Sequence, residues 1–272
     1  MADLKIVSRE YKAMLKASRF AGDEPRLMET AGRFWRAAGE AFASVVVDVG
    51  GNLSDIQAHR LIRFYDTPKQ ELNASGYIFR ERVELDGKRR EVTLKFRHPD
   101  RYVAQDRDMR AAEGDDVRTK FEEDIKPSFQ SLYSHSTTQR IDTGKVLDAV
   151  KDVSRFYPGL KQDLPGLAKD TPIEVVDKFT ARELVIGGAG MQLGKSRRIA
   201  AECVLVVWYD HAKPSNAETP VVVEFSFKYG DGGEDYSGGS VRRAYDAFNL
   251  LQQALPDWVD QASKTKTAFV YG

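Results

Sequence analysis

Charged side chains separated by two residues, or by four, occur in five segments of the sequence that are predicted to form strands. Because successive residues of a strand point to opposite faces, this spacing places the charges of each segment on one face. The segments contain Glu10 and Lys12, Arg80 and Arg82, Lys95 and Arg97, Lys120 with Glu122 and Asp124, and Glu224 and Lys228. A single such face is most simply a solvated surface. Five of them, mixing cations with carboxylates, predict an interior suited to a polyanion held with a metal ion.

The composition limits the classes of protein to which this chain can belong. Its 41 Lys and Arg balance 41 Asp and Glu, whereas proteins that bind nucleic acid or anionic membranes generally carry a basic excess. A hydrophobic fraction of 42% is sufficient for a core. The single cysteine, Cys203, excludes a disulfide framework and a zinc site built from cysteines. No stretch approaches the ~20 apolar residues of a membrane span and no signal peptide is recognised, so a cytoplasmic protein is expected.

The elements that must position these charges can be predicted from hydrophobic spacing and turn signals. Strands are expected over residues 4–16, 45–52, 54–66, 76–85, 89–97, 118–125, 172–186, 198–210 and 221–229, and helices over 25–43, 68–75, 143–156 and 240–255. Residues 98–117 are expected to form a polar loop. Neighbouring strands with few intervening helices predict an antiparallel sheet, or a closed barrel of about eight strands with helices packed outside.

A run of residues in the first half of the chain resembles the signature of the CYTH superfamily, whose members are the triphosphate tunnel metalloenzymes. The residues that carry the resemblance are Phe64-Tyr65-Asp66-Thr67-Pro68, Leu72, Gly76, Phe79-Arg80-Glu81-Arg82 and Thr93-Leu94-Lys95. Their order and spacing agree with the family pattern YFDTP, L, G, LRxR and TLK over about thirty residues.

Weaker similarities extend this resemblance over roughly residues 4–230. The segment 120–124, KFEED, is similar to the RxExE strand of the family, with Lys in place of Arg and Asp in place of the last Glu. Lys178 and Arg182 stand where the family places basic residues on a later strand. The segments VWYD and VEFS are similar to its last two strands.

The resemblance implies one α+β domain over residues 1–272, an eight-stranded antiparallel tunnel barrel with flanking helices and a closing helix at 240–255. Its charged tunnel would hold a small-molecule triphosphate or polyphosphate. The implied reaction is metal-dependent hydrolysis of an inorganic, nucleoside or thiamine triphosphate, with adenylyl-cyclase-type chemistry as an alternative. No membrane partner is implied, an RNA 5′ end is the one nucleic acid considered, and a monomer or homodimer is expected.

The resemblance also implies roles for individual residues of this chain. Lys12 and Lys95 would be catalytic. The implied phosphate ligands are Lys12, Arg80, Arg82, Lys95, Lys120, Lys178 and Arg182; Arg and Lys neutralise phosphate charge. The implied ligands of Mg²⁺ or Mn²⁺ are Glu10, Glu122, Asp124 and Glu224, since hard cations of this kind prefer carboxylate and water oxygens.

Two positions depart from the family pattern. The family's ExExK motif reads Ser8-Arg9-Glu10-Tyr11-Lys12 here, and Ser226 stands where a second acid often lies on the last strand. A hydroxyl is a poorer ligand for a hard cation than a carboxylate, so metal binding should be weakened. Two hypotheses therefore stay open: a metal-dependent triphosphatase, and a catalytically silent protein that binds polyphosphate or a nucleotide in the same tunnel.

Residues 189–196, AGMQLGKS, match a permissive form of the phosphate-binding P-loop. That motif needs a helix immediately after it, but the following residues become apolar and β-branched within a few positions. We therefore interpret this segment as a loop between two strands. In a barrel, Lys195, Arg197 and Arg198 would lie at a mouth of the tunnel.

Overall fold

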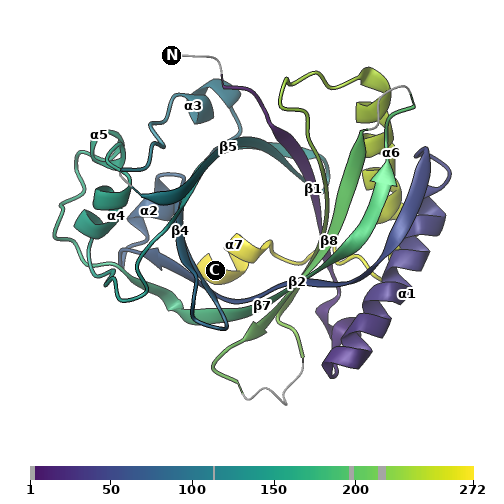
Figure 1. Ribbon diagram of the computed structural model, residues 1–272, viewed down its shortest axis with the longest axis horizontal. Helices are drawn as coiled ribbons and strands as arrows, with labels where there is room; N and C mark the ends of the chain where they lie inside the picture. Colours follow the sequence, from purple (N-terminus) through teal and green to yellow (C-terminus); the bar gives the residue numbers. More distant parts are fainter. Residues whose placement is uncertain (1–3, 113, 196–198, 214–218) are drawn as a thin grey trace.

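The computed structural model describes residues 4–112, 114–195, 199–213 and 219–272. Within these residues, nine strands bond edge to edge in the order β1-β5-β6-β4-β3-β2-β7-β8-β9, and β9 closes the ring onto β1 (Figure 1). The strands are β1 (Ser8–Leu15), β2 (Asp48–Asp66), β3 (Tyr77–Glu84), β4 (Arg90–His98), β5 (Asp115–Lys126), β6 (Gln130–Arg140), β7 (Glu174–Gln192), β8 (Ala200–Asp210) and β9 (Val222–Tyr229).

The ring corrects the expected eight-stranded antiparallel barrel in two respects. It contains β6, which lies in a stretch where no strand is predicted, because the sequence QSLYSHSTTQR is rich in Ser and Thr and lacks a clear apolar alternation. A closed ring with an odd number of strands cannot alternate direction throughout, so at least one neighbouring pair must run parallel. That pair is β1 and β5, whose register places Glu10 opposite Asp124. The other neighbouring pairs of the nine described strands are antiparallel.

Three boundaries differ from those predicted, and each difference has a local cause. Residues 45–52 and 54–66 were expected as separate strands but contribute to one strand, β2, which passes through Gly51 in a left-handed conformation with φ of 70°. The glycines near residue 190 likewise do not end β7, which continues to Gln192. The expected loop at 98–117 contains a short helix, α3 (Arg101–Gln105), and the start of β5.

Helices lie around the ring. α1 (Glu24–Phe42) begins after Asp23, whose carboxylate accepts a hydrogen bond from the backbone N–H of Arg26. Of the helix predicted at 143–156, α4 (Val150–Phe156) forms, and the helix predicted at 240–255 is α6 (Gly238–Ala254). The other helical segments of the described residues are η1 (Ala17–Phe20), α2 (Glu71–Ala74), α5 (Leu160–Asp163) and α7 (Lys266–Tyr271). Among the described residues, no helix is both long enough and apolar enough to cross a membrane.

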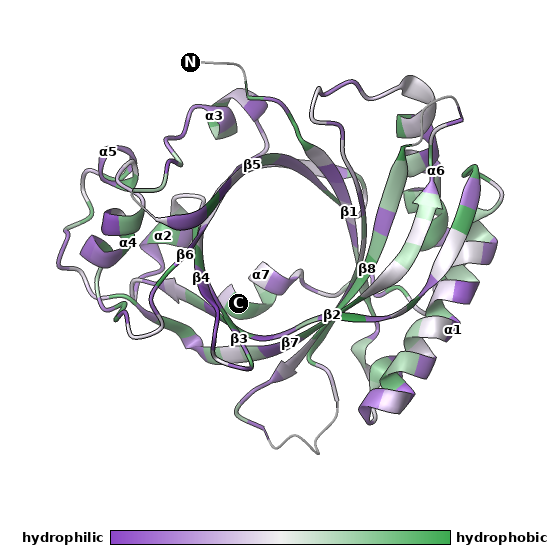
Figure 2. Ribbon diagram, viewed as in Figure 1, coloured by the Kyte–Doolittle hydropathy of each residue, from purple (hydrophilic) through white to green (hydrophobic). Residues whose placement is uncertain are grey.

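Many apolar side chains of the strands point away from the centre of the ring, toward these helices, although a few, such as Val206 and Trp208, line its interior. On β9, Phe225 and Phe227 are fully buried in a cluster with Phe34 of α1 and Phe248 of α6. The intervening Ser226 lines the inside of the ring instead. Figure 2 shows hydrophilic residues along the strands that surround the opening. Because strand residues alternate between faces, packing the helices outside leaves the polar face of the sheet inside.

The C-terminal segment lies against one end of the ring. A β-bridge between Leu15 and Val259 holds its first part, and Val270 of α7 is buried in an apolar cluster with Phe64 and Trp208. Figure 1 shows α7 within the outline of the ring. A helix of only six residues leaves no periodic pattern in the sequence, which is why none of the predicted elements includes it.

The segment that matches a P-loop has a different structure. Residues 189–192 belong to β7, and the next described element is the strand β8 rather than a helix. Of the three basic residues expected at a tunnel mouth, Lys195 is exposed and does not line the central cavity. The other two, Arg197 and Arg198, lie outside the described residues.

Candidate functional site

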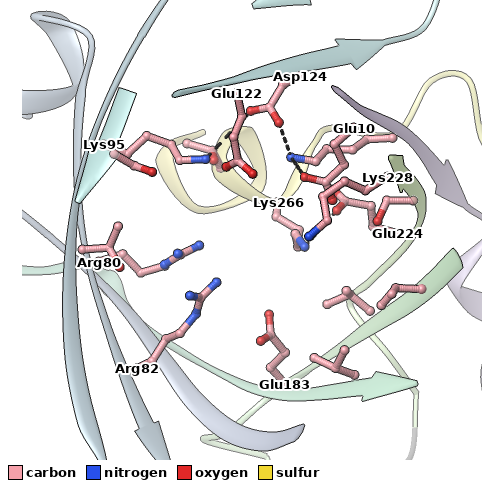
Figure 3. Close-up of a pocket in the computed structure, with 18 of the residues that line it drawn as sticks. Glu10, Arg80, Arg82, Lys95, Glu122, Asp124, Glu183, Glu224, Lys228 and Lys266 are labelled. Atoms are coloured by element: carbon pink, nitrogen blue, oxygen red, sulfur yellow. Dashed lines mark hydrogen bonds and ion pairs between the residues drawn. The ribbon is translucent and has the colours of Figure 1, made fainter. Parts of the chain in front are cut away.

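A cavity of about 420 Å³ occupies the interior of the ring. Among the described residues, eleven Lys and Arg and seven Asp and Glu line it, which is an excess of four positive charges. In Figure 3 the labelled side chains point into this space from several sides. Charges attract more strongly where water is limited, so an enclosed cationic excess favours an anion with several negative charges.

Nine of the residues predicted from the sequence line this cavity. They are Glu10, Lys12, Arg80, Arg82, Lys95, Lys120, Glu122, Asp124 and Glu224. Closure of the sheet brings them together, because it turns one face of every strand toward the same space. Their individual roles in binding or catalysis stay predictions.

Lys178 and Arg182, which the resemblance implies as phosphate ligands, do not line the cavity. Arg182 precedes the inward-facing Glu183, so its own side chain points outward, where the guanidinium lies 4.4 Å from the centre of the Tyr209 ring. Lys178 is exposed and has a φ of 53°, at a point where β7 departs from regular strand geometry. We therefore do not include either residue in the candidate site.

Other charged residues line the cavity although the sequence pattern gave them no role. They are Arg60, Glu91, Arg118, Lys126, Glu183, Glu202 and Lys266. Arg118 and Lys126 share the two-residue spacing of β5, so that spacing could have found them. Identifying Glu183 as a cavity residue requires the register of β7, which cannot be read from the sequence. Lys266 follows the last predicted element, so no spacing rule points to it.

One part of the cavity is built around the ammonium group of Lys12. Its Nζ lies 2.7 Å from Asp124 Oδ1 and 2.9 Å from Glu10 Oε2 (Figure 3). The parallel register of β1 and β5 sets these two acids side by side. Burial disfavours all three charges, but their mutual attraction prevails. The pKa of Lys12 is therefore raised, that of Glu10 is lowered, and that of Asp124 is held well below its usual range by Lys12, Lys95 and Arg97.

The other two acids predicted as metal ligands also have protein partners. Glu122 lies opposite Ser8 in the parallel register, and the Ser8 hydroxyl donates a hydrogen bond of 2.7 Å to Glu122 Oε1. Glu224 Oε1 lies 2.9 Å from the Nζ atom of Lys266. Ser8, which the sequence resemblance aligns with the first acid of ExExK, therefore holds a neighbouring acid in place.

A second part of the cavity holds two arginines that lack a carboxylate partner. Arg80 and Arg82 lie on the inner face of β3, and neither forms an ion pair with any described residue. The Nε atom of each is buried without a hydrogen-bond partner. Burial, together with repulsion from neighbouring guanidinium groups, lowers the pKa of both, that of Arg82 to about 10. The free protein thus keeps two half-buried cations that have no ion-pair partner among the described residues and whose charge Glu183 offsets only in part.

Lys95 on β4 lies between the acids around Lys12 and the two arginines of β3. Its Nζ atom is 3.9 Å from Asp124 Oδ2. Burial lowers the pKa of Lys95 to about 8, with the attraction of Asp124 opposing this change and the charges of Arg97 and Lys12 adding to it. At neutral pH Lys95 is therefore charged, but it loses its proton within the range of ordinary buffers.

Glu183 supplies negative charge opposite the arginines. It accepts hydrogen bonds from Arg60 Nε over 2.6 Å and from Trp208 Nε1 over 2.7 Å. Burial raises the pKa of Glu183, but the positive charges of Arg60, Lys266 and Arg82 outweigh this effect and lower the pKa to about 2. Glu183 is therefore ionised and already has two partners, so it offsets only part of the positive charge around it.

The predicted metal ligands, as they are placed, do not fit a divalent metal ion. No group of three or more His, Cys, Asp and Glu among the described residues is arranged to hold a metal. Mg²⁺ needs oxygen ligands in near-octahedral geometry, whereas at least one oxygen of each of these carboxylates already contacts an ammonium or hydroxyl group. A role for Mg²⁺ or Mn²⁺ stays a prediction of the sequence resemblance.

No protein-family model and no curated protein matches this sequence. Several solved structures are similar to it. The candidate adenylyl cyclase HpAC1 from Hippeastrum, described as having a dominant triphosphatase activity, is 11% identical, with 97% of this chain and 95% of that chain covered and a TM-score of 0.43. A candidate adenylate cyclase from Vibrio parahaemolyticus is 10% identical, with coverages of 98% and 99% and a TM-score of 0.37. One from Bacillus halodurans is 9% identical, with coverages of 99% and 98% and a TM-score of 0.41.

At these identities and TM-scores, the activities of those proteins cannot be transferred to this chain. The closed ring of strands and its charged interior, which the resemblance to the CYTH superfamily implied, are observed directly in the structure. The ring therefore agrees with the architecture that the sequence resemblance implied.

Proposed function

We propose that the cavity binds a small molecule that contains three or more linked phosphates. The observation that carries this proposal is the pair of unpaired arginines on β3, Arg80 and Arg82, whose Nε atoms are buried without a partner. Charge that is withdrawn from water without an ion-pair partner destabilises a folded protein, and a bound polyanion would supply the negative charge that Glu183 provides only in part. Guanidinium groups also bind phosphate oxygens in a bidentate manner, which a point charge cannot do.

The spread of the other cations supports an anion longer than one phosphate. Lys95 on β4 and Lys120 at the exposed part of β5 line the same cavity as the two arginines. These residues come from three strands of the ring. A chain of phosphates offers negative charge over a greater length than a single phosphate does, and its several charges would match the cationic excess of the cavity.

Hydrolysis of the bound compound is a further step that the sequence resemblance implies, with Lys12 and Lys95 as the catalytic residues. The contacts favour binding over this step, because the acids that would assist it are paired with cations or, in the case of Glu122, with the Ser8 hydroxyl. Hydrolysis and cyclisation are tested by phosphate and pyrophosphate release from tripolyphosphate, ATP and thiamine triphosphate, each with Mg²⁺, Mn²⁺ or EDTA. Metal-dependent release that Lys95→Ala abolishes would establish the triphosphatase hypothesis.

Binding itself is tested by isothermal titration calorimetry with inorganic phosphates of increasing length. We expect tripolyphosphate to bind at least about 100-fold more tightly than orthophosphate, because each added charge-assisted contact contributes about 1.5 to 3 kcal/mol. The affinity should fall as the salt concentration rises, as expected for charge pairing. Equal affinity for the two anions, or binding of neither, would contradict the proposed function.

The affinity for tripolyphosphate should depend on pH through Lys95. Since burial lowers the pKa of Lys95 to about 8, its ammonium charge is present below that pH and is lost above it. We therefore expect the affinity to decrease as the pH rises from 7 to 9, as measured by calorimetry. Lys95→Arg is the control, because its side chain stays charged over this range while the ionisation of the ligand is the same. Identical pH profiles for the two proteins would exclude Lys95 as the titrating group.

A further inference from the structure

Lys266 enters the cavity from the C-terminal segment rather than from a strand. It begins α7, and its Nζ atom lies 2.9 Å from Glu224 Oε1 on β9. The next residue, Thr267, accepts a hydrogen bond of 3.1 Å from Arg97 Nη1, and Val270 is 4% exposed within the apolar cluster at this end of the ring. Contacts of the residues that follow Lys266, together with its own ion pair, therefore hold its ammonium group inside the cavity.

The charge of Lys266 acts on acids of several strands. Besides its ion pair with Glu224, it lowers the pKa of Glu183 on β7 and of Glu10 on β1. Figure 3 shows Lys266 reaching toward the middle of the cavity, with Glu224 and Glu10 on the same side. A compact ammonium group that faces carboxylates from different strands occupies the electrostatic position that a bridging cation would take.

Lys12 has a similar part next to two other acids of the cavity. It contacts Glu10 and Asp124 within 3 Å, while Glu122 accepts a hydrogen bond from Ser8. Each carboxylate that could bind a metal ion thus has a contact from this chain, and even with these acids the cavity has an excess of positive charge.

We infer that the cavity binds its polyanion without a divalent metal ion, because Lys266 supplies next to Glu224 the positive charge that a metal would bring. The inference rests on the proposed function and deepens it by assigning a residue of the C-terminal segment to the site. It differs from the metal-dependent binding that the sequence resemblance implied, because the cation is the side chain of Lys266 at the start of α7.

The test uses the full-length protein and its Lys266→Gln variant, which removes the charge and leaves a shorter, neutral polar side chain. Tripolyphosphate binding is measured by calorimetry in EDTA, and Mn²⁺ binding is measured on the ligand-free proteins. We expect the wild-type protein to bind tripolyphosphate in EDTA and to bind no Mn²⁺. In Lys266→Gln the affinity for tripolyphosphate should fall about tenfold, and Mn²⁺ binding should appear because Glu224 has lost its cation.

Two further variants separate the charge of Lys266 from its part in docking α7. Lys264→Gln removes the same charge two residues earlier, at an exposed position that does not line the cavity, and should behave as the wild-type protein. Lys266→Arg keeps the charge and should retain most of the affinity in EDTA. Equal losses in Lys266→Arg and Lys266→Gln would show that only docking matters and would overturn the inference.

The outcomes distinguish this inference from the proposed function. Tripolyphosphate binding that is absent in EDTA but appears with Mg²⁺ or Mn²⁺ would overturn the inference and leave the proposed function intact. Equal Mn²⁺ affinity of the wild-type protein and Lys266→Gln would also overturn it. If tripolyphosphate binds neither in EDTA nor with Mg²⁺ or Mn²⁺, the proposed function is wrong, and the inference that rests on it is wrong as well.

Discussion

Replacing Arg80 and Arg82 together by methionine is expected to weaken tripolyphosphate binding by at least about 100-fold while raising the thermal midpoint of the ligand-free protein. The affinity falls because charge-assisted hydrogen bonds contribute about 1.5 to 3 kcal/mol each, and 1.4 kcal/mol corresponds to a factor of ten. The stability rises because burial and repulsion disfavour both charges in the free protein. Calorimetry and thermal unfolding measure the two effects on the same samples.

Arg182→Met provides the matched control for this variant. It removes the same charge from the same ring of strands, but from a side chain that stacks on Tyr209 outside the cavity. Its affinity for tripolyphosphate should equal that of the wild-type protein. An unchanged affinity in the double variant would exclude the β3 arginines as the anion site, and a loss in Arg182→Met would show that the effect is not specific to the cavity.

Asp124→Asn is expected to reduce the free energy of unfolding by about 3 to 5 kcal/mol, the usual cost of breaking a buried ion pair on one side. Asp124 is 1% exposed and faces Lys12, Lys95 and Arg97. Without the negative charge of Asp124, the repulsion among these three cations is less compensated. Tripolyphosphate should then stabilise the variant, because a ligand that binds only the folded state shifts the unfolding equilibrium.

The measurement is chemical or thermal unfolding of the wild-type protein and the variant, each with and without tripolyphosphate. Asp86→Asn is the control, because Asp86 and Lys88 form an exposed pair at 3.5 Å, and such pairs contribute little. Its unfolding free energy should stay within about 0.5 kcal/mol of the wild-type value. A loss in Asp124→Asn no larger than that in Asp86→Asn would contradict the proposed charge balance around Lys12.

The sequence predicted the strands that alternate clearly and failed where alternation was absent. β3, β4 and β9 combine apolar outer residues with charged inner ones, so their positions could be predicted to within a residue or two. The Ser- and Thr-rich β6 has small polar side chains on both faces, so its sequence carries no two-residue pattern. The parallel pairing of β1 with β5 is a property of the closed ring as a whole, and no local segment encodes it.

The residues of the candidate site likewise divide into those that strand spacing predicts and those that depend on tertiary structure. The charges on β3, β4 and β5 were found because their spacing places them on one face, and closure of the ring then brought them together. Arg182 lies outside the cavity while the adjacent Glu183 lines it, since a shift of one position along a strand moves a side chain to the other face. Lys266 could not have been found, because its place depends on tertiary docking of the last few residues.

β1 is the first of the described strands, yet both of its neighbours in the ring, β5 and β9, are more than 90 residues away in the sequence. Ser8 bonds to Glu122 across a sequence separation of 114 residues, and Arg9 bonds to Tyr229 across 220. Closing loops of this length costs chain entropy before native contacts can compensate, so we expect slow folding for a chain of this size. Until β9 has been synthesised, β1 has an unpaired edge that other chains could join. A nascent or truncated chain lacking β9 should therefore aggregate.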